Sequence, residues 1–151
     1  MNDRLVTALP DLSLFAGLVL VLLANRFAPW PQLGGLGIWF VGVMLVLSSL
    51  LVGMTVLLGL RRRRTSTSAG ETPSVLVTSG AYRFSRNPYY LASAGLLLGV
   101  AALTGSLLAL LVPAGYAFVI NRFVIPVEER KLLQQFGADY EQYRGSVGRW
   151  L

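Results

Sequence analysis

Four long stretches of apolar residues divide the chain, at about residues 12–27, 33–60, 88–103 and 107–125. The second stretch contains no charged residue and is the surest membrane span, since about 20 apolar residues cross the hydrocarbon core as a helix. As a helix the third stretch would be ~24 Å long, slightly less than the core, so it crosses incompletely or thins the bilayer locally. Three residues, 104–106, separate the last two stretches, which predicts an antiparallel helical hairpin.

Charged and polar residues predict which end of the bundle faces the cytoplasm. Arg61–Arg64 follow the second stretch directly, and residues 65–73 form a polar linker rich in Ser and Thr. Basic residues beside a span favour the cytoplasmic side. We therefore expect both termini and the loop after residue 60 to be cytoplasmic.

The first stretch has a second interpretation, as the apolar core of a secretory signal peptide. Such a peptide has a basic segment before its apolar core and a cleavage site of small residues after it. Here the preceding segment carries Asp3, Arg4 and Asp11, and no clear cleavage site follows. We expect this stretch to be retained as a membrane anchor.

Residues 126–151 have a different composition, with charged and amide side chains every few positions. Their apolar residues recur at the three- and four-residue spacing of an amphipathic helix, which would lie on the membrane face or fold back over the helix ends. Glycines at 137, 145 and 148 predict one or more breaks. The predicted fold is all-α: one domain, 1–151, that is a polytopic membrane helical bundle of about four transmembrane helices, with a cytoplasmic loop and an amphipathic C-terminal helix.

Composition supports the membrane assignment and excludes several kinds of site. The chain has 151 residues, of which 54% are hydrophobic and 13% charged, with a mean hydropathy of +0.62. It contains neither cysteine nor histidine, which excludes disulfides, thiolate zinc sites and a cysteine nucleophile and removes the commonest general base. Four of its thirteen basic residues form one run after a span, so the net charge of +6 indicates topology rather than nucleic-acid binding. We expect no metal and no nucleic acid.

The segment before the third stretch combines features of an anion site. Asn87 is suited to cap a helix and Pro88 to its first position. The free N–H groups of that helix end would favour a carboxylate or phosphate beside Arg83 and Arg86. Aromatic faces for an adenine ring or a cation are offered by Tyr82, Tyr89 and Tyr90. The alternative is that these residues are interfacial anchors, which tyrosine and arginine commonly are.

Three further charged residues also have structural interpretations. Glu128 and Glu129 open a helix after Pro126, where carboxylates favour the helix dipole. Arg122 lies at the inner end of the fourth stretch, where its side chain can reach the lipid headgroups.

Two sequence motifs, in this order and separated by the predicted hairpin, favour a function over these interpretations. The first is Leu76-Val77-Thr78-Ser79-Gly80-Ala81-Tyr82 followed by Arg86-Asn87-Pro88-Tyr89-Tyr90. The second is Glu128-Glu129 followed by Leu132, Phe136-Gly137, Tyr140 and Tyr143. On these motifs, residues 74–151 resemble the isoprenylcysteine carboxyl methyltransferase and phospholipid N-methyltransferase superfamily of integral membrane enzymes.

The resemblance implies methyl transfer from S-adenosylmethionine to a lipidic or membrane-embedded acceptor at the cytoplasmic face. S-adenosylmethionine offers a carboxylate for a helix N-terminus, an ammonium and hydroxyls for a carboxylate, and an adenine and sulfonium for aromatic faces. By resemblance, the cofactor pocket would comprise Ser74, Val75, Leu76, Val77, Tyr82, Asn87, Pro88, Tyr89, Tyr90 and Glu128.

The resemblance also suggests catalytic positions, with two departures from the family pattern. The catalytic candidates are Arg86, Asn87, Glu128 and Glu129. Asn87 replaces the family's histidine, so imidazole chemistry is impossible there, although an amide still offers a donor and an acceptor. The basic residue that often precedes the Glu-Glu pair is missing, and the nearest one, Arg122, is our candidate for substrate binding. The acceptor therefore stays open. The lack of histidine suits a carboxylate slightly better, since it is already ionised at neutral pH; the alternative is an amine, with Glu128, Glu129 or a tyrosine as base.

Two other functions remain open. Sterol and steroid reductases share a related fold and a similar motif, and would use NADPH. A non-catalytic membrane module that binds lipid or a partner would use the arginine run as an anchor for anionic lipid. The oligomeric state is also open, because small residues such as Gly95 and Gly99 allow close helix contacts within or between subunits.

Overall fold

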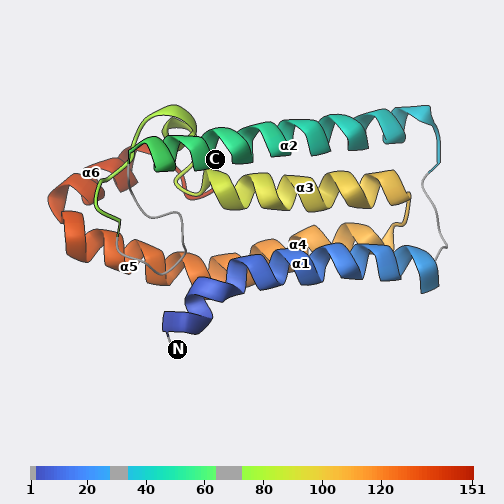
Figure 1. The fold of residues 1–151 in the computed structure, drawn as a ribbon, viewed down its shortest axis with the longest axis horizontal. Helices are drawn as coiled ribbons and strands as arrows, with labels where there is room; N and C mark the ends of the chain where they lie inside the picture. Colours follow the sequence, from blue (N-terminus) through green and yellow to red (C-terminus); the bar gives the residue numbers. More distant parts are fainter. Residues whose placement is uncertain (1–2, 28–33, 64–72) are drawn as a thin grey trace.

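A computed structural model describes residues 3–27, 34–63 and 73–151, and all regular structure in these ranges is helical (Figure 1). The predicted all-α membrane bundle is confirmed. Leu33, Arg64 and the predicted linker at 65–72 lie outside the described residues. The helices are α1 (Asp3–Phe27), α2 (Leu36–Arg62), η1 (Gly80–Arg83), α3 (Pro88–Thr104), η2 (Leu108–Leu110), α4 (Leu111–Val119), the π-helix η3 (Ile120–Val124), α5 (Ile125–Phe136) and α6 (Ala138–Ser146).

Within the described ranges, three helical segments are long and apolar enough to cross a membrane: Thr7–Phe27, Leu36–Arg62 and Leu108–Phe136. Pro88–Thr104 is a shorter apolar helix, in keeping with the short third stretch. Large apolar side chains on α1 and α2 are exposed, for example Phe15 at 68% and Leu51 at 67%. In a bilayer these side chains would face lipid.

The first helix begins earlier than the apolar stretch that predicts it. The stretch starts at about residue 12, whereas α1 starts at Asp3 and contains Pro10. Hydropathy marks the part of a helix that lipid surrounds, and a helix can extend beyond that part into the polar interface. The early start brings the polar end of α1 to the site described below.

The fourth helix continues past the expected boundary at residue 125. One run of helix extends from η2 through α4, η3 and α5. Pro126 has no N–H to donate within the helix, and the wider turn of η3 directly before it accommodates the irregularity. Glu128 and Glu129 therefore lie on the continuation of the fourth apolar helix.

Close backbone contact joins α2 to α3. A Cβ atom added at Gly99 would lie 2.9 Å from the Val46 nitrogen and 3.0 Å from the Gly42 oxygen. One added at Gly95 would lie 2.5 Å from Ser49 Oγ. Glycine is required here because any side chain would separate the two helices.

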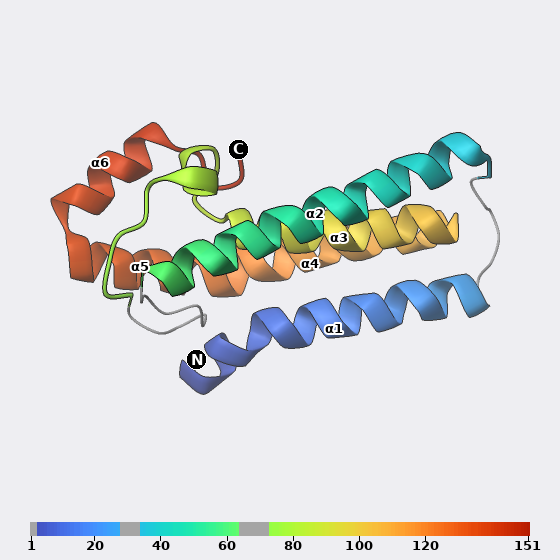
Figure 2. The ribbon, with the colours of Figure 1, turned by 45° about the horizontal axis from the view of Figure 1, so that its top comes forward.

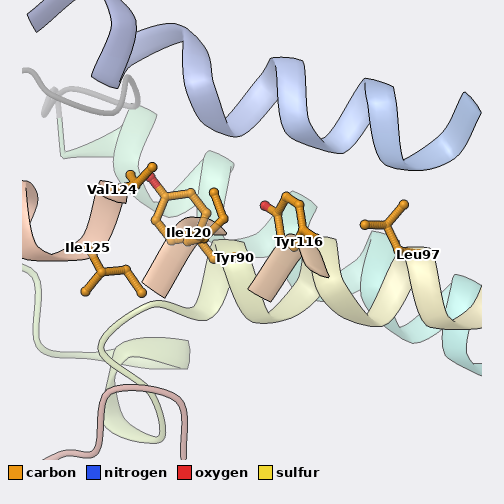
Figure 3. Close-up of a cluster of buried hydrophobic side chains, with 6 residues drawn as sticks. All are labelled: Tyr90, Leu97, Tyr116, Ile120, Val124 and Ile125. Carbon is orange, nitrogen blue, oxygen red and sulfur yellow. The ribbon is translucent and has the colours of Figure 1, made fainter. Parts of the chain in front are cut away.

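A buried cluster fixes the start of α3 against the fourth helix. Figure 3 shows its six side chains, from α3, α4, η3 and α5: Tyr90, Leu97, Tyr116, Ile120, Val124 and Ile125. Leu14 and Leu18 of α1 and Trp150 near the C-terminus pack against the cluster. The beginnings of α3 and α5 are thus held side by side.

The polar segments gather at one end of the bundle. The start of α1, the end of α2, the loop at 73–87, α5 and α6 all lie there, while the turn at Gly105 lies at the other end (Figure 1). Gly137, with φ of +50°, separates α5 from α6, so the expected break occurs at a backbone conformation that suits glycine. The tail then folds back over the bundle end, and the Arg86 N–H donates to the Gly148 oxygen at 3.0 Å (Figure 2).

Candidate active site

A cavity of about 370 Å³ opens at this polar end. Pockets for small molecules and cofactors usually measure about 300–1,000 Å³. Its walls come from α1, α2, the loop at 73–87, the start of α3, and α5 and α6. The cavity therefore draws on both sequence motifs.

Most of the residues predicted for the cofactor pocket line this cavity: Val75, Leu76, Val77, Tyr82, Asn87, Pro88, Tyr89, Tyr90 and Glu128. The catalytic candidates Arg86 and Glu129 line it too. So do Leu132, Tyr140 and Tyr143, which belong to the second motif but were not predicted as site residues. The helical hairpin between the two motifs brings them together.

Two of the predicted residues are not among the residues that line the cavity. Ser74 is exposed beside it in the loop. Arg122 is exposed on η3, and its guanidinium carbon lies 5.6 Å from the centre of the Phe123 ring. A contact of either residue with a ligand stays a prediction.

The start of α3 has the predicted backbone and a different side-chain arrangement. Asn87 occupies the N-cap position and Pro88 the first turn, but the Asn87 side chain makes no capping hydrogen bond. Its Nδ2 instead donates to the Arg149 oxygen at 2.9 Å. The backbone N–H of Asn87 donates to Ser85 Oγ at 3.1 Å. The N-terminal start of α3 is thus left without a side-chain cap where it borders the cavity.

Glu128 is held by a hydrogen bond across the two motifs. Tyr90 Oη donates to Glu128 Oε1 at 2.7 Å, joining residues 38 positions apart. Tyr90 is 6% exposed, so this bond is shielded from water. One carboxylate oxygen of Glu128 is therefore fixed, in a wall of the cavity.

Glu129, the next residue, lies between two guanidinium groups. Arg86 Nη1 is 2.9 Å from Glu129 Oε1. On the other side, Arg149 donates from Nε to Oε1 at 3.1 Å and from Nη2 to Oε2 at 2.6 Å. This two-point contact is the strong geometry for an arginine and a carboxylate. The charge of Glu129 is therefore compensated within the protein.

One donor of Arg86 has no hydrogen-bond partner in the part of the chain that the structure describes. Arg86 Nη1 also donates to Tyr140 Oη at 3.3 Å. Its Nε atom is buried and has no hydrogen-bond partner among the described residues. A buried, unsatisfied donor on a cation is costly, and an anionic ligand would satisfy it.

The tyrosines at this end are neutral at physiological pH. Burial, with the nearby Glu128 carboxylate second, raises the pKa of the Tyr82 hydroxyl well above its usual value. Burial likewise raises the pKa of Tyr143 to about 12, although Arg86 opposes the change. Tyr143 Oη donates to the Tyr82 oxygen at 2.8 Å, so this hydroxyl fastens the loop to α6. Neither tyrosine is suited to be a general base.

Several residues of the site were not predicted from the sequence. Leu57 and Leu60 of α2 and Thr7, Pro10 and Asp11 of α1 also line the cavity. The residues of α2 lie at the predicted cytoplasmic end of the second apolar stretch, and those of α1 lie just before the first. This position could have predicted that they line the site. Arg149 was not singled out either, and its partners are too distant in sequence for local spacing to reveal them.

Among the residues that the structure describes, no group of three or more acidic side chains is placed to hold a metal ion.

Comparison with known proteins gives two matches. Residues 37–139, more than half of the chain, match the phospholipid methyltransferase family. The chain is also 36% identical over 81 residues to protein-S-isoprenylcysteine O-methyltransferase of Saccharomyces cerevisiae. That match covers 52% of this chain and 33% of the yeast protein, so the chain spans about a third of the length of this curated relative. No solved structure matches.

Proposed function

From the premise that the chain belongs to the phospholipid methyltransferase family, we propose that it transfers a methyl group from S-adenosylmethionine to a lipidic or membrane-embedded acceptor. The observation that carries this proposal is the cavity that joins the two motifs, with Tyr90 of the first bonded to Glu128 of the second. A fold or a family does not by itself assign a reaction to a protein. A cavity that is built from both motifs supports methyl transfer as the reaction.

The described groups fit S-adenosylmethionine. The buried Nε of Arg86 and the uncapped start of α3 suit its carboxylate. Glu128, with one oxygen bonded to Tyr90, suits an ammonium or a ribose hydroxyl. The rings of Tyr82 and Tyr89, both in the lining, suit the adenine and the sulfonium.

The chemistry needs alignment and a dry site more than a strong base. When bound, S-adenosylmethionine supplies an electrophilic methyl group and leaves as S-adenosylhomocysteine. The protein's contribution would be to align donor and acceptor and to exclude water. Because Tyr82 and Tyr143 stay neutral, Glu128 is our candidate to accept a proton from an acceptor that must lose one.

The wall formed by α1 and α2 supports an acceptor that enters from the membrane. Pro10, Leu57 and Leu60 line the cavity there, and both helices expose apolar side chains to the bilayer. Asp11 lies in the same wall. Of the lining residues described, Arg86 is the one cation, and it is already assigned to the carboxylate of the cofactor. The carboxylate of Asp11 therefore favours an amine over a carboxylate as the acceptor.

The orientation in the membrane is also part of the proposal. Arg61 and Arg62 end α2 on the side of the bundle that carries the cavity. By the positive-inside rule, this side and both termini face the cytoplasm.

Binding of the cofactor product tests the proposal without knowledge of the acceptor. We expect isothermal titration of the detergent-purified protein to show saturable binding of S-adenosylhomocysteine and none of NADPH. Tight NADPH binding without S-adenosylhomocysteine binding would support a reductase. If the folded protein bound neither, a lipid- or partner-binding module would replace the enzyme.

A further inference from the structure

We infer that Arg149 is a positioning residue of the site, acting on the cofactor pocket through Glu129, Arg86 and the start of α3; this inference rests on the proposed function. Arg149 is not among the residues that line the cavity, and it lies beyond the part of the chain that matches the family. Its influence on the cavity therefore passes through the residues that it contacts.

The guanidinium of Arg149 links two parts of the fourth helix. Two of its nitrogens bond to the Glu129 carboxylate, at 2.6 and 3.1 Å. Its third nitrogen, Nη1, donates to Asn121 Oδ1 at 3.2 Å, and the same oxygen accepts from Trp150 Nε1 at 3.3 Å. Arg149 thereby joins Asn121 in η3, where the helix widens, to Glu129 about two turns further along, in α5.

The backbone beside this guanidinium holds the start of α3. The Arg149 oxygen accepts from Asn87 Nδ2 at 2.9 Å and from Ser85 Oγ at 3.4 Å. One residue earlier, the Gly148 oxygen accepts from the Arg86 N–H at 3.0 Å. Three successive residues before α3, Ser85, Arg86 and Asn87, are thus bonded to two successive residues of the tail.

These contacts set the environment of Arg86. Arg86 and Glu129 are both largely buried, with side chains 11% and 14% exposed, so their charges interact strongly. Two guanidinium groups on one carboxylate leave one positive charge over. That excess suits the cavity for an anionic group, and without Arg149 the remaining pair would be neutral.

The positioning role predicts that binding depends on the guanidinium shape of residue 149. We expect Arg149→Ala to weaken S-adenosylhomocysteine binding by about 10–100-fold, as loss of charge-assisted bonds typically does. Arg149→Lys should recover part of this loss, because a lysine keeps the charge but cannot bridge Glu129 and Asn121 together. Arg130→Ala is the matched control, since it removes an exposed arginine next to Glu129 that does not line the cavity.

A second measurement distinguishes positioning from a general effect on folding. If Arg149 acts through Glu129, the Arg149→Ala change should cost less than threefold in binding when it is made in a Glu129→Gln protein. A full loss in that background would overturn the inference. This comparison holds even where Arg149→Ala lowers overall stability.

A third measurement does not depend on the proposed function. Hydrogen exchange of the ligand-free protein should become faster at residues 85–90 in Arg149→Ala and stay unchanged in the α2–α3 contact. If the wild-type protein failed to bind S-adenosylhomocysteine, the proposed function would be wrong. The exchange rates at residues 85–90 would still show whether Arg149 stabilises the start of α3. Unchanged exchange at residues 85–90, with binding within threefold of wild type, would overturn the role of Arg149.

Discussion

Glu128 and Glu129 are neighbours in the chain, but their carboxylates have different partners. Glu129 is shared by Arg86 and Arg149. Glu128 accepts from the neutral Tyr90 hydroxyl and borders the cavity. This contrast predicts structural support from Glu129 and ligand contact from Glu128.

Replacing Glu128 by Gln tests that division. The change keeps the shape of the side chain and its acceptor for Tyr90, but removes the charge that would face an ammonium. Charged hydrogen bonds are worth about 1.5–3 kcal/mol, so we expect a loss of about 10–100-fold in affinity for S-adenosylhomocysteine, measured by titration. Glu141→Gln, on the exposed side of α6, is the matched control. Near-normal affinity of Glu128→Gln would remove Glu128 from the site.

Tyr143 should make stability depend on pH in the alkaline range. Its folded pKa, about 12, is above the ordinary value of 10.0, so the folded state holds this proton more tightly than the unfolded state does. The stabilisation is complete below pH 10 and is lost as the pH rises toward 12. We expect wild-type stability to fall more steeply over this range than that of Tyr143→Phe, in thermal unfolding at stepped pH. Parallel profiles would contradict the raised pKa.

At the residue scale, the sequence predicted which residues line the cavity better than it predicted the hydrogen bonds between them. Tyr82, Tyr90 and Glu128 were predicted because the motifs contain them, and the family resemblance is confirmed by the match over residues 37–139. The Asn87 side chain was expected to cap α3, but the Arg149 oxygen, 62 residues away, takes its donor. A pairing of that kind depends on how the tail folds back, which local spacing does not encode.

At the scale of elements, the close contact of α2 and α3 is the most sensitive to substitution. At Gly99 a Cβ would meet two backbone atoms of α2, the Val46 nitrogen at 2.9 Å and the Gly42 oxygen at 3.0 Å, which cannot move aside as a side chain can. We expect Gly99→Ala to lower the free energy of unfolding in detergent by about 1–3 kcal/mol, the usual cost of overpacking.

Gly115→Ala on α4 is the matched control for Gly99→Ala. A Cβ there meets nothing within 4 Å among the described atoms, so stability should be unchanged or slightly higher. Equal stability of Gly99→Ala and wild type would mean that α2 and α3 are further apart than described here.

The positions of the helices could be predicted from the sequence where local composition determines them. The apolar runs marked all four apolar helices, and Pro88 marked the start of α3. The continuity of the fourth helix through Pro126 did not follow, because a π-helical turn depends on packing around Ile120 and Val124, both fully buried. Proline statistics favour a boundary at that position.

At the scale of the whole molecule, orientation in the membrane can be tested directly. The chain has no cysteine, so single cysteines can be added without further changes. Gln142 on α6 lies at the end with the cavity, and Leu36, 88% exposed, lies at the other end. In intact cells, a membrane-impermeant maleimide should label Leu36→Cys, and Gln142→Cys only after permeabilisation. The reverse pattern would invert the proposed topology.

The return of the tail to the start of α3 also fixes an order of events during synthesis. The donors of Ser85, Arg86 and Asn87 find their acceptors on residues 148 and 149, which the ribosome adds more than 60 residues later. The helices α3 and α4 leave the ribosome before residues 148 and 149 do, so they can enter the bilayer first. The contacts between the tail and residues 85–87 form afterwards. A chain truncated before residue 148 would therefore carry an inserted bundle that lacks these contacts.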